Sequence, residues 1–202
     1  MPRQNRVLPT GAIVAATFRG TLMGNRGILH DADGRIVRPW ATRRWIACRL
    51  AFKGRRRTVM APGRYTELFF ADEVTALAAG HRPCAECRRA DYERFRDAWT
   101  TAFGGPRPSA DAMDATLHSA RLRPGSRDQR RTRATLRDLP DGVFVLDGAG
   151  RPALVGGVAL RPQIDGTYAP PEPADPAREF PMLTPEPVVA VLRTGYVTGQ
   201  VS

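Results

Sequence analysis

The feature that most constrains this chain is a pair of cysteines, Cys84 and Cys87, separated by two residues. A two-residue spacer folds both thiols to one side, where they can reach a single metal ion. A helix predicted directly after Cys87 places its positive end beside the thiols, and flanking arginines also favour the thiolate form. The pair therefore predicts a metal-binding turn, and a thioredoxin-like redox pair is the alternative.

The third cysteine, Cys48, lies in a segment of alternating side chains, residues 44–52, that predicts a strand. An odd number of cysteines argues against a disulfide framework, so we predict that Cys48 is a zinc ligand. The alternative is a small apolar side chain packed in the core. The fourth ligand is His30, His81, an Asp or Glu, or water, and we favour His30 because it lies on a neighbouring hairpin. A zinc-bound water would have its pKa lowered to ~7 and become a nucleophile.

Hydrophobic periodicity predicts an α+β fold of β-hairpins, a zinc-binding turn and helices, followed by a small β-rich C-terminal part. We divide the chain into a zinc-binding region (1–103), a linker with a basic helical segment (104–138), and a C-terminal region (139–202) packed on the first. The predicted elements are a strand at 12–23, hairpins at 28–38 and 44–61, a strand at 65–70, helices at 72–79, 88–103 and 110–122, a helix or mobile loop at 123–138, a hairpin turn at 148–151, loop at 162–186 and a last strand at 188–197.

The segment ELFFADEVTALAAGHRPCAECRR, residues 67–89, resembles the C-terminal part of the Ada-type zinc domain of methylphosphotriester DNA-repair proteins. The resemblance is carried by an aromatic strand end, a helix ending in Ala-Ala-Gly, and an Arg-Pro-Cys turn followed by Cys-Arg. It implies a zinc ion held by cysteines and a domain that grips DNA through basic residues. In that family, one cysteine of the first pair accepts a methyl group, whereas this chain has Cys48 alone in the upstream part.

A net charge of +11 predicts a polyanionic partner. Genomic base composition explains the use of arginine in place of lysine, but it does not explain why the 31 basic residues outnumber the 20 acidic residues. Arginine binds phosphate through its bidentate fork, and interleaved aromatic rings can stack on bases. The expected nucleic-acid-binding residues are Arg26, Arg43, Arg44, Arg55, Arg56, Arg57, Arg82, Arg88, Arg89 and Trp45.

A second candidate site lies on the predicted helix at 110–122. Asp114, His118 and Arg121 share one face of that helix because they are four and three residues apart. A carboxylate beside a histidine raises its basicity, and an adjacent arginine can hold a phosphate, so this trio is a candidate general acid–base cluster. An ordinary surface ion pair is the alternative.

These observations predict a zinc-containing protein that binds nucleic acid, DNA rather than RNA, in repair or in recognition of modified DNA. The runner-up is a nucleic-acid-processing hydrolase, a nuclease or glycosylase, that uses an open zinc or the Asp114–His118–Arg121 cluster. A third reading is a small-molecule zinc enzyme whose basic surface reflects codon usage alone. We expect a cytoplasmic protein without a membrane span, a signal peptide or an obligate protein partner.

Overall fold

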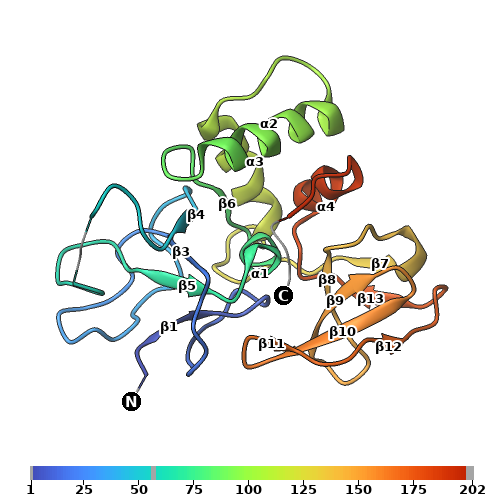
Figure 1. The fold of residues 1–202 in the computed structure, drawn as a ribbon, viewed down its shortest axis with the longest axis horizontal. Coiled ribbons are helices and arrows are strands. Elements are labelled where there is room, and N and C mark those ends of the chain that lie inside the picture. The colour runs from blue at the N-terminus through green and yellow to red at the C-terminus, as the bar shows by residue number, and fades with distance from the viewer. Residues whose placement is uncertain (1, 56–57, 199–202) are drawn as a thin grey trace.

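The computed structural model describes residues 2–55 and 58–198, and in this part of the chain two principal β-sheets and four α-helices form an α+β fold. The predicted fold class is therefore confirmed. Figure 1 shows the N-terminal sheet on one side and the C-terminal sheet on the other, with α1 between them and α2 and α3 across the top. Within the described ranges, no helix is both long and apolar enough to cross a lipid bilayer.

The N-terminal sheet has the strand order β2-β1-β5-β3-β4-β6, with parallel pairing at β1–β5 and β4–β6. Side chains alternate across its two faces, as the period of a β-strand requires. One face packs Ala47, Leu68 and Phe70 into a core, and the other carries Cys48 and its neighbours. The strands are β1 (Gln4–Val7), β2 (Ile13–Ala15), β3 (Leu22–Asn25), β4 (Ile46–Arg49), β5 (Leu68–Phe70) and β6 (Arg82–Pro83).

Two predictions for this half need correction. The strand expected at 12–23 is divided into β2 and β3. The hairpin expected at 44–61 is wrong, because β4 pairs with β3 and β6 rather than with the chain that follows it. That following chain turns repeatedly, with a positive φ at Lys53 and Met60, so it cannot run as a partner strand. The hairpin at 28–38 is confirmed in outline by a single bridge between His30 and Ile36.

The three predicted helices before residue 123 are confirmed. Helix α1 (Glu73–Ala78) is capped by Asp72, whose carboxylate accepts a hydrogen bond from the backbone N–H of Thr75 at 2.8 Å. Helix α2 (Arg89–Phe103) buries Tyr92, Phe95 and Trp99, and α3 (Ala110–Arg121) begins after the capping side chain of Ser109.

The C-terminal half is richer in strands than the sequence indicated. The predicted hairpin turn at 148–151 is confirmed, with Leu146 opposite Pro152. Segments expected to be helix or loop contribute short strands, at 133–135 and between 167 and 181. The elements are β7 (Arg133–Thr135), a 3-10 turn (Leu136–Asp138), β8 (Phe144–Leu146), β9 (Pro152–Gly156), β10 (Ala159–Ile164), β11 (Thr167–Tyr168), β12 (Glu172–Pro173) and β13 (Glu179–Pro181).

The last strand expected at 188–197 is a helix, α4 (Glu186–Arg193), so this prediction is wrong. Its consecutive valines favour a strand by intrinsic preference. Burial of Val188, Val191 and Leu192 on one helical face outweighs that preference. This face joins a core that also contains Phe95 of α2, so the C-terminal region packs on the helices that follow the cysteine pair.

Candidate metal centre

The three cysteines are brought together by β4 and by the turn that follows β6. Cys48 lies on β4, and β6 runs parallel to it with Pro83 opposite Ala47. The backbone N–H of Cys84 donates to the carbonyl oxygen of Ala47 at 2.9 Å, which holds the turn against the strand. Cys87 closes the turn just before α2 begins, so residues almost forty positions apart in the sequence become neighbours.

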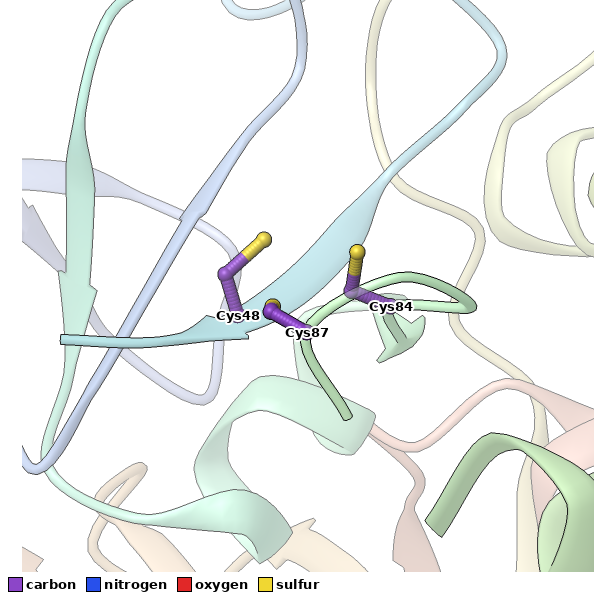
Figure 2. A group of neighbouring side chains, drawn as sticks. All are labelled: Cys48, Cys84 and Cys87. Carbon is purple, nitrogen blue, oxygen red and sulfur yellow. The ribbon is translucent and has the colours of Figure 1, made fainter. Parts of the chain in front are cut away.

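The sulfur atoms of Cys48, Cys84 and Cys87 all lie within 4.8 Å of one another. Figure 2 shows Cys48 projecting from the strand beside the turn that carries Cys84 and Cys87. Each residue is only 7–8% exposed. Three thiols at this spacing are the donor set that zinc prefers, so the residues fit a bound zinc ion.

Hydrogen bonds within the cluster shift the pKa values of the thiols in different directions. The pKa of Cys84 is lowered to about 5, chiefly by a hydrogen bond with the Cys48 thiol. The same hydrogen bond, together with burial, raises the pKa of Cys48. Burial raises the pKa of Cys87, although the backbone N–H of Arg49 donates to its sulfur at 3.4 Å and opposes that shift. Of the three cysteines, only Cys84 has its pKa shifted towards the thiolate form.

No fourth ligand from the described residues joins the cluster. Within the described part of the chain, the group of candidate metal-binding side chains contains only the three cysteines and no histidine or carboxylate. The seven residues outside the described ranges include no Cys, His, Asp or Glu. A tetrahedral ion held by these three thiols would have one coordination position left for a further ligand.

His30, the expected fourth ligand, has other partners. Its Nδ1 lies 2.6 Å from the hydroxyl oxygen of Thr66, and its Nε2 lies 3.3 Å from the carbonyl oxygen of Ala61. The fully buried His81 accepts a hydrogen bond at Nε2 from Arg26. We expect the His30→Ala variant to keep one bound zinc per chain, because neither ring nitrogen belongs to the cluster; native mass spectrometry measures this directly. Loss of the zinc in this variant alone would restore His30 as a ligand.

A pocket of about 280 Å³ opens beside the three cysteines. Its floor is the sheet face opposite the core, where Phe69, Met23 and Cys48 stand side by side on β5, β3 and β4. Asn25 and Ile46 continue this floor. They pair with one another across β3 and β4, and each lies two residues from Met23 or Cys48 on its own strand. The same alternation that buries one face of the sheet thus builds the pocket on the other. The remaining lining residues are Arg49, Leu50, Phe52, Arg55, Val59, Tyr65, Glu67, Cys84, Glu86 and Cys87.

Buried ion pairs hold the cysteine turn from both sides. Arg82 binds Asp114 of α3 through two hydrogen bonds of 2.9 and 2.7 Å, with both side chains at most 4% exposed. Arg88 pairs with Glu73 of α1 at 2.8 Å and with Asp91 at 2.9 Å. These two arginines were expected to contact nucleic acid, and their burial and carboxylate partners show that they support the turn instead.

Arg26 and Trp45, also expected to contact nucleic acid, are about 1% exposed. The guanidinium groups of Arg26 and Arg121 lie over the Trp45 ring, 4.1 and 3.8 Å from its centroid. Arginine stacks well on aromatic faces because its planar cation is weakly hydrated. The expectation is therefore wrong for both residues, which belong to the interior of the fold.

Four of the expected contact residues remain on the surface: Arg43, Arg44, Arg55 and Arg89. Three of these form exposed ion pairs, Arg44 with Asp111, Arg55 with Glu86 and Arg89 with Glu93. Such pairs are weak and exchange readily for other anions. Arg56 and Arg57 lie outside the described residues.

The second candidate site is not arranged as a general acid–base cluster. Both carboxylate oxygens of Asp114 accept hydrogen bonds from Arg82. Burial, Arg121 and Arg43 lower the pKa of His118, whereas a carboxylate partner would raise it. Arg121 is 2% exposed and donates to the carbonyl oxygens of Gly80 and Arg43. The structure thus places these side chains in the packing of α3 against the N-terminal half.

The pocket residue Glu67 was not expected from the sequence, and neither was the place of Arg49 and Phe69 in the pocket lining. Arg49 is exposed beside Cys48. Glu67 directly precedes β5 and Phe69 lies within it, and both side chains line the pocket. The alternation of side chains along the strand carried this signal. Glu67 and Phe69 lie on one face of the sheet, and the core residue Leu68 lies on the other. Comparison of the chain with protein-family models, curated proteins and solved structures gave no match.

Proposed function

We propose that this protein binds one zinc ion through Cys48, Cys84 and Cys87 and binds nucleic acid, DNA in particular, on the surface around that site. The observation that carries the proposal is the convergence of the three buried cysteines beside a pocket. The ion would join β4 to the start of α2 and so stabilise the fold, because metal-binding free energy adds to folding free energy when the unfolded chain lacks the site.

The charge of the chain supports a nucleic-acid partner. The net charge of +11 is what remains after every carboxylate has been counted against a basic side chain. Arg49 and Arg43 are exposed near the cysteine cluster and its supporting elements, and they have no carboxylate partner among the described residues. The resemblance of residues 67–89 to Ada-type zinc domains points to the same class of partner, and we propose a role in repair or recognition of modified DNA.

An enzymatic role is the second candidate, and one observation favours it. The absence of a fourth ligand among the described residues leaves one position of a bound zinc ion for water or a substrate. Catalytic zinc sites have this composition of three protein ligands and one exchangeable ligand. The same observation disfavours a purely structural ion, which is usually closed by four protein ligands.

The nucleic-acid proposal predicts a salt-dependent affinity in which Arg49 takes part. We expect the logarithm of the association constant for short DNA to fall linearly with the logarithm of salt concentration, because bound arginines displace counterions from phosphates. The Arg49→Gln variant should weaken binding and reduce that slope by about 1. Fluorescence anisotropy of labelled DNA over a series of salt concentrations measures both quantities.

Arg137→Gln is the matched control, because Arg137 is also exposed and lies in the C-terminal half, away from the pocket lining. It should leave the slope unchanged. Equal slopes for both variants and the wild type would remove Arg49 from the interface. Absence of DNA binding at low salt would contradict the nucleic-acid proposal as a whole, while leaving the zinc site to be judged by metal analysis.

A further inference from the structure

The pocket beside the cysteine cluster has the size and lining of a site for one small ring system. Its volume of about 280 Å³ is just below the range of roughly 300–1,000 Å³ that holds drug-sized ligands. Three aromatic side chains, Phe52, Tyr65 and Phe69, contribute to its wall. Aromatic and apolar walls are what proteins use to hold a base removed from its stack.

The inner end of the pocket is negatively charged when the metal site is filled. Three thiolates outweigh the two charges of a zinc ion, so the loaded cluster is anionic. Glu67 lines the same pocket and is 4% exposed, and one of its carboxylate oxygens accepts a hydrogen bond from the backbone N–H of Met60 at 2.7 Å. A phosphate or carboxylate would be repelled from this end, whereas the donor-bearing edge of a neutral or cationic ring would be attracted.

The entrance of the pocket carries the opposite charge. Arg49 and Arg55 are exposed lining residues. Lys53 and Arg55 lie over the Phe52 ring, 5.2 and 5.5 Å from its centroid. Glu86 pairs with Arg55 at 2.7 Å, but Arg49 has no carboxylate partner within the described part of the chain. The rim is therefore suited to a phosphate, and the interior to an uncharged or positive ring.

This polarity matches a nucleotide that enters with its base first. We infer that the pocket seats a single nucleobase of a bound nucleic acid strand, with the base against Phe52, Tyr65 and Phe69 and the neighbouring phosphates at Arg49 and Arg55. Glu67 and the amide of Asn25, which also lines the pocket, offer hydrogen-bonding groups to the base edge. A positively charged, alkylated base fits the interior better than a neutral one, because aromatic faces and a carboxylate both attract a cation.

The inference rests on the proposed function, since it names the part of the nucleic acid that the site recognises. Two short DNA strands separate the two ideas: one with abasic sugars throughout, and one that is identical except for a single central adenine. The zinc-loaded protein should bind the fully abasic strand through phosphate alone. It should bind the adenine strand about tenfold more tightly, the gain expected from stacking one base on aromatic side chains.

Two variants locate that gain in the pocket. Phe52→Leu and Tyr65→Leu should each reduce the ratio of the adenine-strand affinity to the abasic-strand affinity severalfold. Phe103→Leu is the matched control, because Phe103 is an exposed phenylalanine at the end of α2, and it should leave both affinities unchanged. Zinc content is measured on each variant so that a lost metal is not mistaken for a lost contact.

The results separate recognition of a base in the pocket from binding of nucleic acid in general. Binding of both strands with equal affinity, or an equal loss for both strands in Phe52→Leu and Tyr65→Leu, would overturn the base pocket and leave nucleic-acid binding in place. Binding of neither strand would overturn both. A strand with one N-methylated, positively charged adenine should bind more tightly than the adenine strand, and the same two variants should reduce that difference.

Discussion

Replacing Cys84 by serine is expected to abolish stable zinc binding. The serine hydroxyl is a poor zinc ligand at neutral pH, and only two thiolates would remain. Loss of groups that merely orient a ligand weakens metal affinity by about 10–100-fold, so loss of a ligand itself should exceed 100-fold. Native mass spectrometry after dialysis against a chelator should show one zinc in the wild type and none in Cys84→Ser.

The matched control for this substitution is Ala90→Ser, which adds a hydroxyl to an exposed position of α2 shortly after the cysteine turn. It should retain the zinc. Cys48→Ser should behave like Cys84→Ser, because Cys48 would be the ligand contributed by β4. Full zinc occupancy in Cys48→Ser would reduce the site to the C-x-x-C pair and restore the interpretation of Cys48 as a packed apolar side chain.

The second large effect is expected at the buried ion pair between Arg82 and Asp114. We expect Asp114→Ala to lower the free energy of unfolding by about 3–5 kcal/mol, because it leaves the guanidinium group buried without a counter-charge. Arg82 directly precedes Pro83 and Cys84, so zinc affinity should fall as well. Urea denaturation of the zinc-loaded protein measures the first effect, and competition with a chelating dye measures the second.

Asp111→Ala provides the comparison for this prediction on the same helix. Asp111 also pairs with an arginine, Arg44 at 3.1 Å, but the two side chains are 72% and 69% exposed. Its loss should cost less than about 1 kcal/mol. Similar values for the two variants would contradict the structural role assigned to Asp114. Unchanged stability in Asp114→Ala with lost activity on nucleic acid would instead revive the acid–base cluster on α3.

The local part of the site was predictable from the sequence. The spacing of Cys84 and Cys87, the Gly80 stop before them and the helix after them follow from short-range rules that depend on few neighbours. The alternation around Cys48 placed it on a strand, and the structure pairs that strand with the cysteine turn. Joining the two segments required a long-range pairing that sequence spacing alone cannot specify.

The remaining expectations failed where burial decided the outcome. Arg26, Arg82 and Arg88 have the charge of surface residues, and only the tertiary structure shows the Trp45 ring and the carboxylates that accommodate them inside. Likewise, the valines before residue 192 favour a strand until a helical face is buried against α2. His30 lies on a hairpin near the site, but hydrogen bonds to Thr66 and Ala61 orient its ring elsewhere.

The proposal depends most on a zinc ion bound by three cysteines, with a fourth ligand that is not sulfur. X-ray absorption at the zinc edge of the purified wild-type protein tests this directly. We predict three sulfur neighbours at about 2.3 Å and one oxygen or nitrogen neighbour at about 2.0–2.1 Å. Four sulfur neighbours, or a protein that retains no zinc, would contradict it.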